Sequence, residues 1–309
     1  MANLPIAIIK VARPVHWIKN FSLFAALIFT ENLLNHDLFI RVLWAFIAFS
    51  LATSATYIFN DVLDVNMDRL HPIKKNRPIA SRALPIPLAL LEAAVLALAA
   101  ITLSSLLNPL FFMSVVFYLI IQALYSTLIK NVPTLDILAI AFGFVIRVYA
   151  GAFVIDAHLS VWFLLCVISV ALFLASGKRR AELNLISENS GTTRKSLSSY
   201  QKELLNSYVT MFGNAAWMSW ALFAFFESPK ASINFWLILA ELSRTTTIDK
   251  LLMATIPVAI FGIMRYESLI FEGKSEAPEK ILLTDKSLLV SIGLWLTIVL
   301  LVFYGGVSI

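Results

Sequence analysis

Charged residues are scarce in this chain: Asp, Glu, Lys and Arg together make up only 14% of its 309 residues. Hydrophobic residues reach 60%, and the mean hydropathy is +0.84. Such values lie outside the range of soluble globular domains. The lysines and arginines form no continuous basic stripe, which argues against nucleic acid as a partner. The composition therefore predicts a polytopic membrane protein with little sequence left for a separate soluble domain.

Cysteine is nearly absent, and this absence removes one class of constraint. Cys166 is the single cysteine and lies in an apolar run, so no intrachain disulfide can form and the redox compartment stays undetermined. We also expect no cleavable signal peptide. Residues 1–15 are weakly amphipathic, and no small-residue cleavage site follows a short apolar core.

Long apolar segments are what the chain has in abundance. About nine of them are long enough to cross a bilayer core as helices, which predicts an all-α fold. Their limits are 17–34, 38–59, 83–103, 109–129, 134–155, 159–177, 207–227, 246–267 and 286–306. Prolines or charges mark the breaks between them.

The positions of Lys and Arg predict the orientation in the membrane. Of the 24 such residues, Arg147 lies within a span, and four fall in loops on one side: Arg41, Lys230, Arg244 and Lys250. All the others fall at the amino terminus or in the loops of the opposite side. Since cytoplasmic loops carry the excess of positive charge, we expect a cytoplasmic amino terminus and an external carboxyl terminus, in a bacterial-type inner membrane.

An acidic motif, Asn60-Asp61-x-x-Asp64-x-x-x-Asp68, follows the second apolar span. At about 100° per residue the three aspartates fall within about 60° of one another on a helix. Three like charges repel, and the helix carboxyl terminus adds negative potential. A bound cation explains the arrangement best, and oxygen-only ligands with room for substrate phosphates are typical of Mg²⁺. The alternative is a solvated acidic helix end.

Cations follow the acidic motif directly, at Lys74, Lys75, Arg77 and Arg82. Beside a carboxylate-bound Mg²⁺ they would form a receptor for a diphosphate. Lys74 and Lys75 are equally well explained as positive-inside loop charge, whereas Pro78 restricts the backbone beside Arg77.

Three further segments allow two interpretations each. The opening Arg13-Pro14-Val-His16-Trp17-Ile-Lys19-Asn20 is more typical of an interfacial membrane anchor than of a site. Lys130 and Asp136 can reach a phosphate or sugar hydroxyl, or cap helix ends around Pro133. Arg147, inside a span, is either a substrate contact or a hydrogen-bonded link between helices.

A dense basic cluster follows the sixth span, at Gly177-Lys178-Arg179-Arg180-Ala-Glu182 and at Arg194-Lys195. Cations complement a helix carboxyl terminus, so part of this charge is ordinary. The density exceeds what orientation requires and suits an anionic lipid head group.

The acidic motif within about nine spans resembles the intramembrane prenyltransferases of the UbiA superfamily, over essentially the whole chain. The resemblance implies one UbiA-like transmembrane domain, residues 1–309. It is closer to the polyprenyl-phosphate (decaprenyl-phosphate) phosphoribosyltransferases. The residues that carry the closer match are Arg13-Pro14 with Trp17-x-Lys19-Asn20, Asn60 to Arg77 with His71-Pro72, Tyr125 to Lys130, Gly177-Lys178-Arg179 with Ala181-Glu182-Leu183, Arg194-Lys195-Ser196-Leu197, and Arg265-Tyr266.

One departure from the superfamily pattern supports that branch. Members that join a prenyl diphosphate to an aromatic acceptor carry a second Asp-rich motif after the sixth span, and here no aspartate lies between Ser176 and Tyr200. A basic second region suits a substrate with a bare phosphate. The resemblance thus implies Mg²⁺-dependent transfer of 5-phosphoribose from phosphoribosyl diphosphate to a polyprenyl phosphate lipid at the cytoplasmic face, with release of diphosphate.

The predicted catalytic and metal-binding residues are Asp61, Asp64 and Asp68. The predicted substrate-binding residues are Lys19, Asn60, Lys74, Arg77, Tyr125, Lys130, Asp136, Arg147, Lys178, Arg179, Glu182, Arg194 and Lys195. The alternatives are an aromatic, quinone-pathway prenyltransferase of the same fold and, from another class, a transporter. A transporter would usually show inverted repeats and broken helices, and neither is evident in the sequence.

Overall fold

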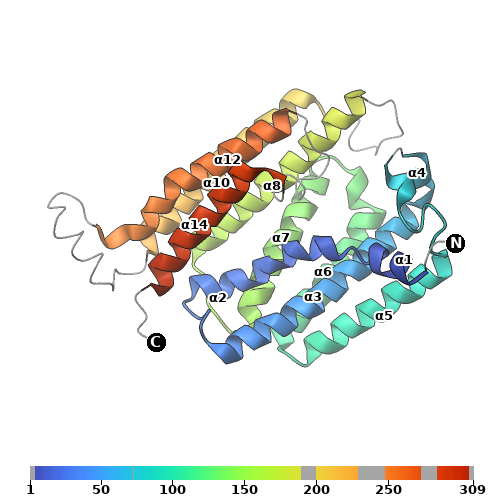
Figure 1. Ribbon diagram of the computed structural model, residues 1–309, viewed down its shortest axis with the longest axis horizontal. Helices are drawn as coiled ribbons and strands as arrows, with labels where there is room; N and C mark the ends of the chain where they lie inside the picture. The colour runs from blue at the N-terminus through green and yellow to red at the C-terminus, as the bar shows by residue number, and fades with distance from the viewer. Residues whose placement is uncertain (1–3, 72, 189–199, 229–247, 273–283, 306–309) are drawn as a thin grey trace. The chain divides into compact units, whose positions relative to one another are not determined.

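The computed structural model describes residues 4–71, 73–188, 200–228, 248–272 and 284–305, and every regular element in these ranges is helical (Figure 1). Eight helices are long and apolar enough to cross a membrane. They are α3 (His36–Leu63), α5 (Ile86–Ser105), α6 (Pro109–Thr127), α7 (Leu135–Val154), α8 (Val161–Glu188), α10 (Lys202–Phe226), the 3₁₀ segment η4 with α12 (Ile248–Thr255, Ile256–Phe271), and α14 (Lys286–Tyr304). The all-α prediction is confirmed, with a count close to the expected one.

The first predicted span, 17–34, is not one continuous α-helix. After the short helix α1 (Leu4–Val11), the 3₁₀ segment η1 runs over Pro14–Phe24 and leads into the short helix α2 (Ala25–Phe29). Polar side chains of η1 bond to α3: Trp17 Nε1 donates to Ser54 Oγ at 2.9 Å, and Asn20 Nδ2 donates to Ser50 Oγ at 3.0 Å. The segment therefore packs through specific hydrogen bonds as well as through apolar contacts.

Two compact units make up the chain. The first comprises Met1–Leu27, Asn32–Ala157 and Ile186–Tyr200, and the second comprises Ile28–Glu31, His158–Leu185 and Gln201–Ile309. All residues of the acidic motif belong to the first unit, and the Gly177–Glu182 cluster belongs to the second.

In the first unit, α3 is the central element. It packs most extensively along α5 and also contacts α6 and η1. Val11 of α1, Ile58 of α3 and Ala89 of α5 belong to one buried cluster. Helix α7 approaches η1 so closely that a Cβ on Gly151 would lie 2.1 Å from the carbonyl oxygen of Leu23. Glycine at this position is thus required by packing.

In the second unit, α12 packs between α10 and α14. Phe173, Val209, Tyr266 and Leu288 form a buried cluster where these helices meet α8. Helix starts follow ordinary capping rules in both units. Asn108 caps α6, and Asp285 caps α14, through side-chain oxygens that accept from backbone N–H groups.

Candidate active site

The three aspartates of the acidic motif lie on two helices that meet at a break. Helix α3 ends at Leu63, Asp64 takes a non-helical conformation (φ −90°, ψ 4°), and the short helix α4 runs over Val65–Leu70. The backbone N–H of Asp68 donates to the carbonyl oxygen of Asp64 at 2.8 Å, so these two residues stand one turn apart. A single continuous helix, as the spacing predicts, is replaced here by a helix and a separate turn.

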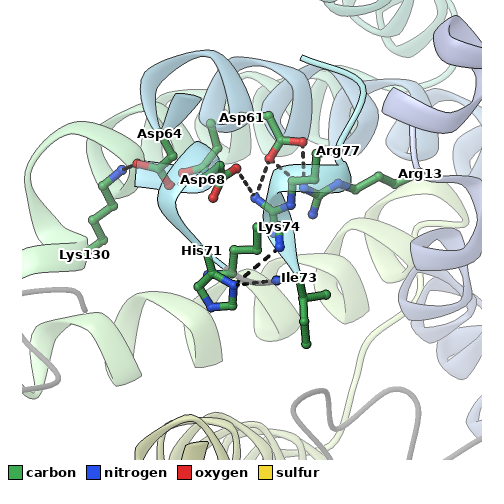
Figure 2. Close-up of polar contacts among 10 residues, drawn as sticks. Arg13, Asp61, Asp64, Asp68, His71, Ile73, Lys74, Arg77 and Lys130 are labelled. Atoms are coloured by element: carbon green, nitrogen blue, oxygen red, sulfur yellow. Dashed lines mark hydrogen bonds and ion pairs between the residues drawn. The ribbon is translucent and has the colours of Figure 1, made fainter. Parts of the chain in front are cut away.

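Arg77 draws two of the carboxylates together. Its Nη1 lies 2.6 Å from Asp68 Oδ2 and 3.0 Å from Asp61 Oδ1, and Figure 2 shows the guanidinium between the two side chains. Both aspartates are buried. Charge-assisted bonds of this length are among the stronger polar contacts in proteins. The prediction that Arg77 belongs to the acidic site agrees with this geometry.

Arg13 is a member of the site that sequence reasoning did not include. Its Nη2 lies 2.6 Å from Asp61 Oδ1 and 2.7 Å from Asp61 Oδ2, and its guanidinium sits over the Tyr57 ring at 5.2 Å. The Arg13-Pro14 dipeptide was the available signal. Arg13 and Trp17 both bond to side chains of α3, which the interpretation of this stretch as an interfacial anchor does not predict.

Lys130 neutralises the third carboxylate. It belongs to the 3₁₀ turn η3 (Ile129–Asn131), is 8% exposed, and places Nζ 2.5 Å from Asp64 Oδ1. Asn60 Nδ2 donates to the other oxygen of Asp64 at 3.2 Å. Three carboxylates thus meet three cations, which sets the net charge of the cluster near zero (Figure 2).

Lys74 stands beside this cluster in the 3₁₀ turn η2 (Lys74–Asn76). The turn is held by His71, whose Nδ1 accepts from the backbone N–H groups of Ile73 and Lys74. Burial raises the pKa of Asp68, while the Arg77 guanidinium and the Lys74 ammonium act in the opposite direction. The positive charge of Lys74 therefore acts on Asp68, and a substrate-binding role for Lys74 stays a prediction.

The Asp136 carboxylate accepts hydrogen bonds from groups of the protein itself. Its carboxylate is fully buried, Oδ1 accepts from the Tyr200 phenol at 2.7 Å, and the same oxygen accepts from the Ile137 backbone N–H at 2.9 Å. The Tyr200 oxygen also accepts from the backbone N–H of Thr134 at 2.5 Å. These contacts match the helix-capping alternative for Asp136.

Arg147 links helices of the first unit. Its Nε donates to Asn20 Oδ1 at 2.8 Å, Nη2 donates to Tyr118 Oη at 2.8 Å, and Nη1 donates to the Gly143 carbonyl. The guanidinium also lies 5.5 Å from the centre of the Phe49 ring. With 5% of its surface exposed, Arg147 fits the interpretation as a hydrogen-bonded link between helices. Two other predicted residues, Lys19 of η1 and Tyr125 of α6, are half-buried in the same unit.

Two arginines of the basic cluster on α8 are buried and bonded to side chains of the protein. Arg179 is 1% exposed and pairs with Glu182 one turn later, while Lys178 is half-buried. Arg180 donates to Asn206 Oδ1 at 2.5 Å and also to Asn184. Arg194 and Lys195 lie outside the described residues. Within the described part of this cluster, Lys178 retains the most exposure for an anionic ligand.

Two carboxylates of the acidic site, those of Asp64 and Asp68, are of the type that binds Mg²⁺. Over the described ranges, no group of three or more His, Cys, Asp or Glu side chains is arranged to hold a metal ion. Mg²⁺ commonly takes one or two carboxylates and completes its shell with water and substrate phosphates. Asp64 and Asp68 lie one turn apart and supply carboxylate oxygens of this kind, with Lys130 and Asn60 bonded to the oxygens of Asp64 and Arg77 bonded to Asp68.

The geometry defines a helical protein whose helices are long and apolar enough to cross a membrane, with a cluster of carboxylates paired with Lys and Arg. The model of the UbiA prenyltransferase family matches residues 21–183, more than half of the chain. The chain belongs to this family and is an integral membrane transferase.

Relatives with assigned activities extend the match to nearly the whole chain. The decaprenyl-phosphate phosphoribosyltransferase of Corynebacterium glutamicum is 34% identical over 98% of this chain and 88% of its own length. The enzyme of the same name from Mycolicibacterium smegmatis is 35% identical over 95% of this chain and 91% of its own length.

Solved structures agree on the fold. A UbiA homolog from Archaeoglobus fulgidus bound to GPP and Mg²⁺ superposes with a TM-score of 0.63 at 16% identity, over 97% of this chain and 98% of the other. The same homolog bound to DMAPP and Mg²⁺ gives a TM-score of 0.64, over 96% and 98%. The UbiA-like fold expected from the sequence is confirmed.

Proposed function

We propose that this protein transfers 5-phosphoribose from phosphoribosyl diphosphate to a polyprenyl phosphate and releases diphosphate. The observation that carries the proposal is the similarity, along almost the whole chain, to enzymes named decaprenyl-phosphate phosphoribosyltransferase. The acidic site supports it, because carboxylates interleaved with Arg77 and Lys130 form a receptor for a metal-bound diphosphate. The basic α8 cluster, in which Lys178 is half-buried, supports an acceptor that carries a bare phosphate.

Each residue then has a defined task. Asp64 and Asp68 would hold Mg²⁺, and the ion would supply positive charge against the diphosphate leaving group. Arg77, Lys74 and Lys130 bind oxygens of the donor and orient it. An oxygen of the lipid phosphate attacks the anomeric carbon of the ribose, and the bond from that carbon to the diphosphate oxygen breaks with both electrons leaving on the diphosphate.

The acceptor phosphate is ionised at neutral pH, so no residue is required as a strong base. Catalysis rests on positioning and on the charges already arranged around the site. Since the bundle is apolar, the prenyl chain stays in a hydrocarbon-like environment while its phosphate reaches the polar end. The excess of Lys and Arg on the same side supports a site, and an amino terminus, at the cytoplasmic face.

A membrane assay tests the proposal. Membranes that contain the protein are given radiolabelled phosphoribosyl diphosphate, undecaprenyl phosphate and Mg²⁺, and label is measured in the lipid phase. We expect metal-dependent lipid label that falls by about a hundredfold or more in Asp64→Asn. Arg41→Gln, an exposed change at the far end of α3, serves as the matched control and keeps wild-type transfer.

The contrary result is equally specific. Absence of lipid label from folded wild-type protein would reject phosphoribosyl transfer. Transfer of a prenyl group to 4-hydroxybenzoate, lost in Asp61→Asn, would assign the protein to the aromatic prenyltransferases of the same family instead.

A further inference from the structure

Arg13 occupies a special position in the backbone. It lies between α1 and η1 with φ 52° and ψ 59°, a left-handed conformation that costs free energy for any residue except glycine. Pro14 follows it and begins η1. The strained joint aims the side chain at the end of α3, where its guanidinium lies over Tyr57 and contacts Asp61.

The contact with Asp61 uses both carboxylate oxygens. One nitrogen of Arg13 lies 2.6 and 2.7 Å from them, and Arg77 approaches Oδ1 as a second donor at 3.0 Å. The Asp61 side chain is 2% exposed. If a metal ion displaced Arg13 from this position, a guanidinium with only 19% of its side chain exposed would lose its counter-ion, which is unfavourable.

The other two carboxylates are held differently. Asp64 bonds to Lys130 through one oxygen, and Asp68 bonds to Arg77 through one oxygen. The flexible stem of Lys130 lets its ammonium follow a phosphate without any backbone change. Within the acidic site, a single nitrogen of Arg13 thus contacts both oxygens of Asp61, whereas Arg77 contacts one oxygen each of Asp61 and Asp68, and Lys130 contacts one oxygen of Asp64.

We propose that Arg13 is a positioning residue that keeps Asp61 out of the coordination shell of the metal. Asp64 and Asp68 then supply the protein oxygens of that shell. Through its Oδ1 contact, Asp61 holds Arg77 in the orientation that receives the donor diphosphate. The role of Arg77 rests on the proposed function, whereas the division of labour among the three aspartates does not.

Metal binding by the purified full chain in detergent separates the aspartates. The probe is Mn²⁺ with inorganic diphosphate, followed by electron paramagnetic resonance. Asp64→Asn and Asp68→Asn are expected to weaken Mn²⁺ binding by about tenfold or more, because each removes a charged ligand. Asp61→Asn is expected to stay within about threefold of wild type, whereas Arg13→Gln, which frees the Asp61 carboxylate, should bind Mn²⁺ at least as tightly as wild type. A loss in Asp61→Asn as large as that in Asp64→Asn would overturn the proposal.

A double-mutant cycle tests the positioning role. Arg13→Gln and Asp61→Asn should each lower kcat by about tenfold or more while the KM for the donor changes less, and the double variant should be no worse than the poorer single one. Arg13→Lys, which keeps the charge, should recover part of the loss. If the losses of kcat in the two single variants instead multiply in the double variant, Arg13 acts independently of Asp61 and the proposal is refuted.

Folding and function are controlled separately. Each variant is compared with Arg41→Gln by size-exclusion profile and melting temperature, and Arg13→Lys replaces Arg13→Gln in the cycle if the latter does not fold. If wild-type protein transfers no phosphoribose, the proposed function fails, yet the Mn²⁺ measurement still decides which aspartates bind the metal.

Discussion

Arg147 donates a hydrogen bond to Asn20 at 2.8 Å, although the two residues are 127 positions apart in the chain. The bond joins α7 to η1, and Asn20 in turn donates to Ser50 of α3. A cation within a membrane span thus has its donors satisfied by neutral groups and aromatic faces rather than by a carboxylate.

Loss of this link should destabilise the protein. Asn20→Ala leaves the Arg147 Nε without its acceptor in a buried site, and we expect the free energy of unfolding to fall by about 1–3 kcal/mol. Thermal unfolding in detergent, followed by tryptophan fluorescence, measures the effect against Arg41→Gln. If Arg147→Lys kept the wild-type melting temperature but lost transfer activity, Arg147 would be a substrate contact and this interpretation would be wrong.

The approach of α7 to η1 gives a second prediction. Gly151→Ala would place a Cβ 2.1 Å from the Leu23 carbonyl oxygen, so one element has to move. The expected loss is about 2 kcal/mol or more, as for other overpacked sites. Gly293→Ala on α14 is the matched control, since nothing lies within 4 Å of its Cβ position. Equal melting temperatures for both variants would contradict the close packing.

Asp136 and Tyr200 provide a third prediction, which separates capping from substrate binding. Tyr200→Phe removes one hydrogen bond to a buried carboxylate and should cost about 1–3 kcal/mol of stability. Asp136→Asn should cost less than Asp136→Ala, because the amide oxygen of Asn still accepts hydrogen bonds. Melting temperatures and transfer rates are compared in parallel. Full stability with abolished transfer in Asp136→Asn would instead indicate contact with the substrate.

The pair Arg265–Asp285 predicts a pH dependence. Hydrogen bonding from Arg265, at 2.6 Å, lowers the pKa of Asp285 below its ordinary value near 3.8. Because the folded-state pKa is depressed, the stabilisation is present above the unfolded value and is lost as the pH falls through the folded one. The difference in melting temperature between wild type and Asp285→Asn should therefore shrink below about pH 4. A difference that stays constant from pH 7 to the acid limit would show that the ionised pair contributes nothing, since Asn also caps a helix.

Much of the fold follows from local sequence. Hydropathy locates the spans from 38–59 onward, because a helix in lipid must satisfy its own backbone hydrogen bonds and so depends on its own residues. Asn108 and Asp285 mark helix starts for the same local reason. The segment 17–34 departs from this pattern, since Trp17 and Asn20 are placed by serines on α3.

Some residues of the candidate site can also be found from local sequence, and others cannot. Asp61, Asp64, Asp68 and Arg77 are found from a motif within one short stretch, and their types predict a metal–diphosphate receptor. Arg13 and Lys130 belong to the same cluster through contacts across 48 and 66 residues. Spacing carries no information about such pairs, because the path of the chain between them sets which side chains meet.

The sequence by itself determined a membrane-spanning all-α transferase and its acidic motif, since each depends on composition or on residues within a few turns. The sidedness that its charges indicate stays a prediction. Only the tertiary structure decided that Asp61 is paired through both oxygens, that Asp136 is committed to Tyr200, and that Arg147 links helices. These assignments depend on which buried polar groups find partners when distant segments pack, and a buried group without a partner is too costly to keep.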